Sequence, residues 1–147
     1  SPQLAFDRAR ISALTAILPV PETFGGGGNV RAKDMLGRYG EERAAEFLEA
    51  AGWQILDRNW RCPAGELDIV ARDGTTLVVV EVKTRSGTGF GYPAEAVNHQ
   101  KLARLRRLAG QWLIEHDVHP SQIRIDVVSV LAPPDGPLSI EHLPGVV

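Results

Sequence analysis

In the stretch GELDIVARDGTTLVVVEVKTR, at residues 65–85, three carboxylates and one lysine stand among aliphatic residues on the two sides of a central Asp-Gly pair. Glu66 and Asp68 lie in its first half, and Glu81 and Lys83 lie in its second half. The Asp-Gly pair between the halves predicts a hairpin turn, so the halves are expected to be paired antiparallel strands. Residues two apart in a strand share a face, about 6 to 7 Å from each other. The pattern therefore predicts that Asp68 lies opposite or diagonal to Glu81, where two carboxylates can hold a ligand jointly.

The chemistry that this pair of carboxylates favours is the binding of a divalent cation. Carboxylates this close repel each other unless a proton or a cation lies between them. Their oxygens suit Mg²⁺ or Mn²⁺, and the lack of a Cys/His cluster in the sequence argues against zinc. In phosphodiester hydrolysis a bound ion lowers the pKa of its water and offsets developing charge, and a lysine such as Lys83 can hold that water. The alternative is a salt bridge on a solvated face, with Glu81 paired to Lys83 or Arg85.

Helix and strand patterns on both sides of this stretch predict the elements that position it. Small and apolar residues recur at helical spacing from residue 35 to Gly52, and a second helix is expected from Pro93 to about His116. The expected strands are 53–60, the two halves of 65–85, 122–130 and a short edge strand at 138–143. The order α-β-β-β-α-β, with one strand more at the end, predicts an α/β fold in which helices flank a mixed sheet.

The arrangement of Asp68, Glu81 and Lys83 resembles the PD-(D/E)xK nuclease core. More narrowly, the segments GRYGEERAAEFLEAAGWQILDRNWRCPAGELDIVARDG, VEVKTRS, FGYPAEAV and RIDVVSV resemble the YraN-like family of small bacterial nuclease-like proteins. That family is similar to archaeal Holliday-junction resolvases, and the resemblance spans about residues 31–143. Leu67 stands where the PD label has proline, at a position that is commonly relaxed. The resemblance implies a restriction-endonuclease-like α/β fold and a metal-dependent DNA endonuclease, with branched DNA as a candidate substrate.

The resemblance also implies how a metal site would be built. Asp68 and Glu81 would hold Mg²⁺ or Mn²⁺ together with the backbone carbonyl of Val82, while Lys83 positions the attacking water. Glu41 matches a first-helix glutamate that nucleases of this superfamily often add to the metal site. The alternative for Glu41 is an acid at a helix N-terminus, which the helix dipole favours.

Further residues near the same end of the predicted sheet are candidates for metal or nucleic-acid contacts. Glu66 is expected to share a face with Asp68, where it would bind a second metal, orient a water, or pair with an arginine instead. A polar line on the second helix, together with arginines on other elements, would supply local positive potential for phosphates. The predicted nucleic-acid contacts are Arg38, Arg61, Arg85, Gln100, Lys101 and Arg104. For the line on the helix, the alternative is an ordinary solvated face.

Length and composition suit one domain after an N-terminal extension. The 147 residues carry a net charge of −2 with a pI near 6.1, so a nucleic-acid function must rest on a local patch. Prolines and four consecutive glycines predict that residues 1–34 are an extension with a flexible linker, followed by a nuclease-like domain at 35–147. The single cysteine, and the lack of an apolar run of about 18 residues, favour a cytoplasmic protein without a membrane span.

Two other functional classes fit parts of the pattern. A nuclease-shaped module could recognise branched nucleic acid without cutting it, although such a binder has no need to crowd carboxylates against phosphate. A protein-interaction domain with a structural acidic corner is the third interpretation, and it predicts that Glu81→Gln leaves metal affinity unchanged. For the nuclease interpretation DNA is the expected partner, and the likeness to resolvases, which cut two strands symmetrically, implies a homodimer.

Overall fold

Two helices and five strands make up the part of the chain that the computed structural model describes, residues 30–86 and 97–146. They are α2 (Val30–Ala50), β1 (Gln54–Cys62), β2 (Gly65–Asp73), β3 (Thr76–Arg85), α3 (His99–His116), β4 (Gln122–Leu131) and β5 (Ser139–Leu143). The order α-β-β-β-α-β-β confirms the predicted α/β fold. The predicted N-terminal extension lies outside the described residues, apart from the first turn of α2. Neither described helix combines the length and apolarity that a membrane span requires.

The strands form one mixed sheet whose order follows the chain, β1-β2-β3-β4-β5, so that β3 is central and β5 is the expected edge strand. β3 is antiparallel to β2 and parallel to β4. A parallel pair needs a long crossover connection, and α3 lies in it. In the β2–β3 hairpin Asp73 pairs with Thr76, and Gly74 has a φ of 63°, which confirms the predicted Asp-Gly turn.

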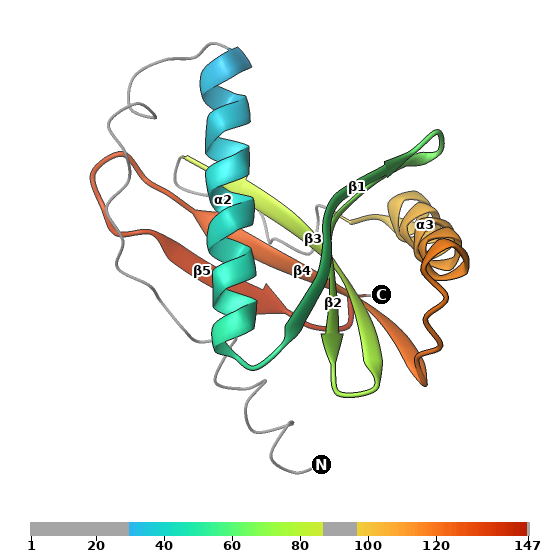
Figure 1. Ribbon diagram of the computed structural model, residues 1–147. Coiled ribbons are helices and arrows are strands. Elements are labelled where there is room, and N and C mark those ends of the chain that lie inside the picture. The colour runs from blue at the N-terminus through green and yellow to red at the C-terminus, as the bar shows by residue number, and fades with distance from the viewer. Residues whose placement is uncertain (1–29, 87–96, 147) are drawn as a thin grey trace.

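The two helices cover opposite faces of the sheet (Figure 1). In β3, Val78 and Val80 pack with α2, whereas Val79 between them packs with α3. The residues that α2 buries are Ala44, Ala45, Phe47 and Leu48. The residues that α3 buries are Leu102, Leu105, Leu108, Ala109 and Trp112. By the same alternation Glu81 and Lys83 share the α3 face of β3, as the sequence predicts.

The first turn of α3 is fixed by a side-chain cap. Asn98 has an extended backbone, and its Oδ1 accepts a hydrogen bond of 2.9 Å from the backbone N–H of Lys101. The helix therefore begins at His99, and the predicted start at Pro93 is wrong, since residues 97 and 98 are not helical. Pro93 itself lies outside the described residues.

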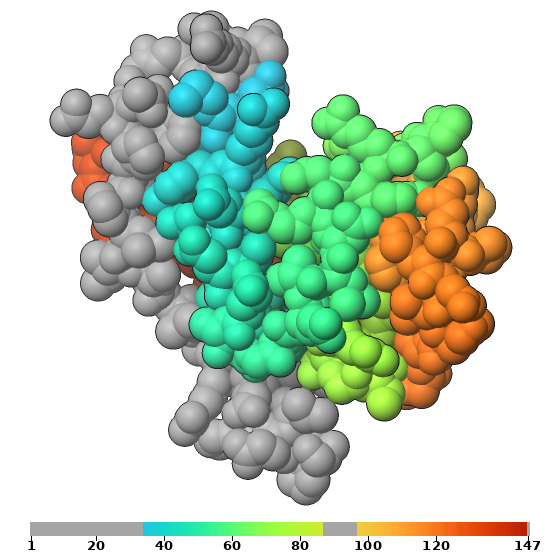
Figure 2. Space-filling model, in the orientation of Figure 1, coloured from blue at the N-terminus to red at the C-terminus, as the bar shows by residue number. Residues whose placement is uncertain are grey.

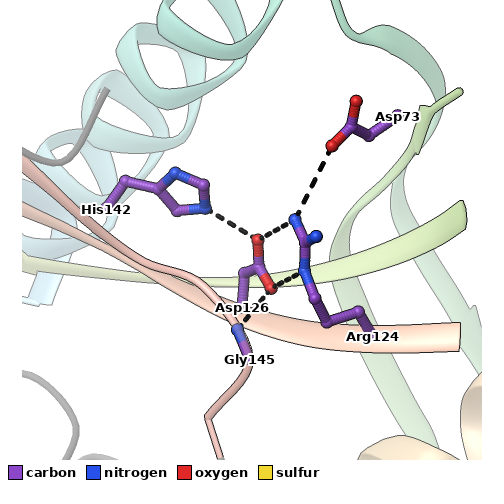
Figure 3. A network of polar contacts seen from close by, with 5 residues as sticks. All are labelled: Asp73, Arg124, Asp126, His142 and Gly145. Atoms are coloured by element: carbon purple, nitrogen blue, oxygen red, sulfur yellow. Dashed lines mark hydrogen bonds and ion pairs between the residues drawn. The ribbon is translucent and has the colours of Figure 1, made fainter. Parts of the chain in front are cut away.

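A buried polar network ties the C-terminal segment to β4 (Figure 3). The fully buried carboxylate of Asp126 accepts hydrogen bonds from Arg124 Nε at 2.8 Å and Arg124 Nη2 at 2.9 Å. It also accepts from His142 Nε2 at 2.7 Å, on β5, and from the backbone N–H of Gly145 at 2.9 Å. The ring of Trp53 packs edge-on against His142 at 5.3 Å and lies under the Arg124 guanidinium at 5.5 Å. The network thus fastens β4, β5 and the loop after α2 to one another.

The Asp126 network is predicted to stabilise the protein above acid pH. Burial alone would raise the pKa of Asp126, but hydrogen bonds from His142 and Arg124 hold this pKa below its usual range. A depressed folded-state pKa adds stability that is present above about pH 4 and is lost as the pH falls through the folded pKa. Asp126→Asn should therefore lower the free energy of unfolding at pH 7 by roughly 3 kcal/mol, measured by urea unfolding, because the largely buried guanidinium of Arg124 loses its counter-charge.

The matched control for this variant is Asp135→Asn, since Asp135 is exposed. The control should stay within about 0.5 kcal/mol of the wild type. Equal stability of the Asp126 variant and the wild type at pH 7 would show that the network contributes nothing.

Candidate active site

The predicted acidic residues meet in one pocket at the end of β3. The pocket has a volume of about 530 Å³ and is formed by α2, β2, β3 and α3. Its lining residues are Glu41, Glu66, Asp68, Glu81, Val82, Lys83, Arg85 and Lys101. The structure therefore brings together every residue that the sequence suggested as a metal ligand, together with the predicted catalytic lysine.

Asp68 enters the pocket where β2 separates from β3. The paired residues of the two strands end at Ile69 and Val80, and beyond them the Asp68 Oδ2 accepts a hydrogen bond of 2.9 Å from the backbone N–H of Val82. The side chain thus replaces a strand-to-strand hydrogen bond. The strict alternation expected of β2 is broken here, because Leu67 packs with the α3 cluster while Ile69 packs with the α2 cluster. Opposite the break, Asn59 of β1 has a positive φ of 53°.

The pocket holds more negative charge than its own cations compensate. Burial, and next the nearby carboxylate of Glu81, raise the pKa of Asp68 to about 7. The charges of Glu41 and Glu66 also raise this pKa, whereas the hydrogen bond from the Val82 N–H lowers it. Burial also raises the pKa of Glu41. The hydrogen bond from Asn59 lowers this pKa, whereas the charges of Glu66 and Glu81 raise it. These four acids therefore act on one another electrostatically, as the hairpin pattern predicts for Asp68 and Glu81.

The cation that neutralises Glu81 comes from α3. Lys101 Nζ lies 2.6 Å from Glu81 Oε1, and the Glu81 side chain is only 15% exposed. The alternative drawn from the sequence, in which Glu81 pairs with Lys83 or Arg85, did not include this partner. For Glu66 the predicted alternative is confirmed, because Arg61 Nε lies 3.1 Å from Glu66 Oε2.

The donor set of the pocket fits Mg²⁺ or Mn²⁺, although it is not a closed cage. The available donors are carboxylate oxygens and backbone carbonyls, which are the hard ligands that these ions prefer. Burial, and next the charge of Glu81, raise the pKa of Asp68, and a cation bound beside this carboxylate would offset both effects. Within residues 30–86 and 97–146, however, no three Asp, Glu, His or Cys side chains converge closely enough to hold an ion as they stand.

A second hollow continues the pocket between α2 and β1, where Figure 2 shows a notch in the surface. Its volume is about 550 Å³, and it shares Glu41 and Glu66 with the first pocket. The other lining residues are Asp34, Gly37, Arg38, Asn59 and Arg61. The predicted contacts Arg38 and Arg61 thus lie beside the acidic pocket, and Arg85 and Lys101 lie in it. Gln100 and Arg104 are exposed on α3 and line neither hollow.

Asn59 is the site residue that sequence reasoning missed. Its side chain hydrogen-bonds Glu41, and its backbone has a positive φ of 53° at the position of β1 opposite Asp68. Asparagine tolerates a positive φ better than most residues, which was the one local signal available.

Gly40 allows α2 to approach β3 closely enough for Glu41 to reach the pocket. A Cβ at Gly40 would lie 1.9 Å from Thr84 Oγ1, closer than atoms can pack. Gly40→Ala should therefore destabilise the protein by about 1 to 3 kcal/mol despite the better helix propensity of alanine. Urea unfolding would measure this loss, and a second substitution, Thr84→Ala, should restore part of it by removing Oγ1.

Gly37 provides the control on the same helix, because a Cβ there meets nothing within 4 Å. Gly37→Ala should raise stability by up to about 1 kcal/mol, as expected for a helical glycine. A Gly40→Ala variant that gained stability to the same extent would show that the close contact with β3 does not constrain α2.

Asp68 is predicted to reduce stability as the pH rises. Its folded-state pKa lies above the unfolded value, so the native protein binds an extra proton between about pH 4 and pH 7, and stability falls across that window. Asp68→Asn removes the charge and keeps an oxygen that can accept from Val82. Without divalent ions this variant should exceed the wild type in unfolding free energy at pH 8, by on the order of a few kcal/mol, and match it near pH 4.

Urea unfolding at the two pH values measures this difference, and Glu141→Gln, at an exposed position on β5, is the control. A less stable Asp68→Asn variant at pH 8 would contradict the repulsion inferred for the pocket.

The part of the chain that resembles known proteins includes the residues that line the acidic pocket. A model described as "Uncharacterised protein family UPF0102" matches residues 40–130. A UPF0102 protein of Beutenbergia cavernae is 62% identical over 117 residues, which are 80% of this chain and 99% of the relative. One of Frankia alni is 62% identical over 116 residues, 79% of this chain and 97% of the relative. One of Kineococcus radiotolerans is 56% identical over 119 residues, 80% of this chain and 98% of the relative. The YraN-like resemblance is confirmed at this level, and the chain belongs to the UPF0102 family.

Proposed function

We propose that this protein is a Mg²⁺- or Mn²⁺-dependent DNA endonuclease of the PD-(D/E)xK type. The observation that carries the proposal is the meeting of Asp68, Glu81, Lys83 and Glu41 in one pocket, where burial and Glu81 raise the pKa of Asp68 to about 7. A structural protein gains nothing from four mutually repelling acids at one end of its sheet. A site that binds a divalent cation and a phosphate gains a preorganised place for positive charge.

Within this proposal the acids hold the metal. Asp68 and Glu81 would coordinate it with the backbone carbonyl of Val82, and Glu41 and Glu66 line the same pocket. When bound, the ion would supply charge stabilisation at the phosphate and a lower pKa for the attacking water. Because Asp68 is held in place by the Val82 N–H, its carboxylate needs little rearrangement to serve as a ligand.

Lys83 is the residue proposed to act on the water and the phosphate. It is exposed at the pocket, and among the described residues it has no ion pair that would hold it elsewhere. Its ammonium would orient the water toward phosphorus and offset charge on the phosphate oxygens. The water oxygen forms the new bond to phosphorus as the bond to the 3′-oxygen breaks. The products would be a 5′-phosphate and a 3′-hydroxyl, as the nuclease resemblance implies.

The second hollow is the proposed path of the DNA strand. Arg38 and Arg61 lie along it, and Arg85 and Lys101 lie at the acidic pocket that it joins. Their side chains would contact the phosphates of the strand, although the whole chain has a net charge of −2. Branched DNA is the substrate class that the family resemblance favours, and a homodimer would allow two symmetric cuts.

A second candidate function is a module that binds branched nucleic acid without cutting it. The observation that favours this candidate is the absence of a preformed three-ligand cage among the described residues, together with the engagement of Glu81 by Lys101. The same hollow and the same arginines would then serve binding alone.

A cleavage assay on labelled four-way junction, flap, single-stranded and duplex DNA tests the proposal. With Mg²⁺ or Mn²⁺ the wild type should cut at least one substrate, and EDTA should abolish cutting. Lys83→Met should slow cutting by about a hundredfold or more, and Glu81→Gln should do so at least as strongly, because each removes a group that acts in the transition state. Glu141→Gln, on the exposed part of β5, is the control and should cut at the wild-type rate.

Binding without cutting on every substrate would favour the recognition module. Metal-dependent cutting that survives in both variants would rule out the pocket as the reaction centre.

A further inference from the structure

The first turn of α3 directs Lys101 at the acidic pocket. Its Nζ lies 2.6 Å from Glu81 Oε1, and its backbone N–H is held at 2.9 Å by the Asn98 cap. The backbone N–H of Leu102 also donates to the Asn98 carbonyl at 2.8 Å, and the side chains of Leu102 and Leu105 are buried against the sheet. The start of the helix is therefore fixed, so the backbone of Lys101 is held within reach of Glu81.

The placement of Lys101 goes against a local rule of helix stability. The N-terminus of a helix carries partial positive charge, which favours acids in the first turn and disfavours a lysine there. The first turn of α3 contains no acid and does contain Lys101. A residue that breaks a local preference usually does so for a contact made elsewhere, and the contact here is Glu81.

The Lys101–Glu81 pair is built to be reversible. The Lys101 side chain is 40% exposed and the Glu81 side chain is 15% exposed, so the lysine can return to water while the carboxylate stays in the pocket. Ion pairs with an exposed partner contribute little to stability, and so they are easily exchanged. Lys83, by contrast, forms no ion pair among the described residues.

We propose that Lys101 is a tethered counter-ion of the reaction centre: its ammonium occupies Glu81 in the metal-free protein and yields that carboxylate to the divalent cation. This inference rests on the proposed function and adds a positioning residue to it. Without a cation at Glu81, the pocket would place this carboxylate unneutralised beside Asp68. Once displaced, the ammonium remains at the rim of a pocket that it already lines, where it adds positive charge toward a phosphate.

The tether makes Lys101 a competitor of the metal. An ammonium that is attached to the pocket and present at every encounter lowers the apparent metal affinity in proportion to the fraction of time it spends on Glu81. Removing the Lys101 ammonium should tighten metal binding, which is the opposite of what loss of a structural contact would do. Replacing Lys101 by another cationic residue should not tighten metal binding.

Calorimetric titration of the full chain with MnCl₂ at pH 8 tests this inference. The variants are Lys101→Gln, Lys101→Arg and Arg106→Gln, the last being a loss of one positive charge at an exposed position on the same helix. We expect Lys101→Gln to bind Mn²⁺ about three- to tenfold more tightly than the wild type. Lys101→Arg should bind no more tightly than the wild type, and Arg106→Gln should stay within about twofold of it.

The outcomes separate this inference from the proposed function. If the wild type binds Mn²⁺ and Lys101→Gln does not bind it more tightly, the counter-ion role is refuted while the metal site stands. An equal gain in Lys101→Gln and Arg106→Gln would also refute it, because the effect would then be one of total charge. If no protein in the series binds Mn²⁺, both the inference and the metal-dependent function fail. Binding by Lys101→Gln alone would support the inference in its strongest form.

Discussion

The burial of Asp68 among other acids is the constraint around which the rest of this structure is arranged. Burial and the charge of Glu81 raise its pKa to about 7, and the hydrogen bond from Val82 holds the carboxylate where that repulsion is felt. The chain accepts this cost instead of placing an apolar side chain there. Stability lost at one site is commonly the mark of a site that serves a ligand, and the ligand proposed here is a divalent cation.

The helices and strands around Asp68 are held in positions that bring their own side chains to the acidic pocket. β3 lies at the centre of the sheet and brings its end to the pocket. Gly40 lets α2 approach β3 so that Glu41 reaches the same space, and Asn98 fixes α3 so that Lys101 faces Glu81. The buried network of Asp126, on the α2 face of β4, has the opposite effect on stability, since its carboxylate is fully compensated. One sheet thus contains a buried acid with cationic and hydrogen-bonding partners, Asp126, and a buried acid that lies among other carboxylates, Asp68.

The features of the site that depend on the alternation of side chains along a strand could be predicted from the sequence. The Asp-Gly turn and the alternation of valines around Glu81 predicted the hairpin, and from it the approach of Asp68 to Glu81. The Lys101–Glu81 pair could not be predicted in the same way, because it depends on where α3 crosses the sheet. The break in alternation at Asp68 escaped prediction as well, since nothing in the residue types of β2 shows where it leaves its partner.

The predicted start of α3 failed for a different reason. A proline at the first position of a helix and an asparagine cap are both ordinary start signals, and the chain offers both within a few residues. The structure uses the asparagine, whose side chain satisfies the N–H of Lys101. Similarly, the interaction of Asn59 with Glu41 joins a strand to a helix across the pocket, and a contact of that kind is set by tertiary packing.

Crystals of the protein grown with Mn²⁺ at pH 8 would test whether the acidic pocket holds a divalent cation. Anomalous scattering at the manganese edge locates the ion without reference to activity. The proposed metal site requires a peak bonded to carboxylate oxygens of both Asp68 and Glu81, with Lys101 displaced from Glu81. Data from well-diffracting crystals at saturating Mn²⁺ that showed no peak in the pocket, or a peak only elsewhere on the surface, would contradict it.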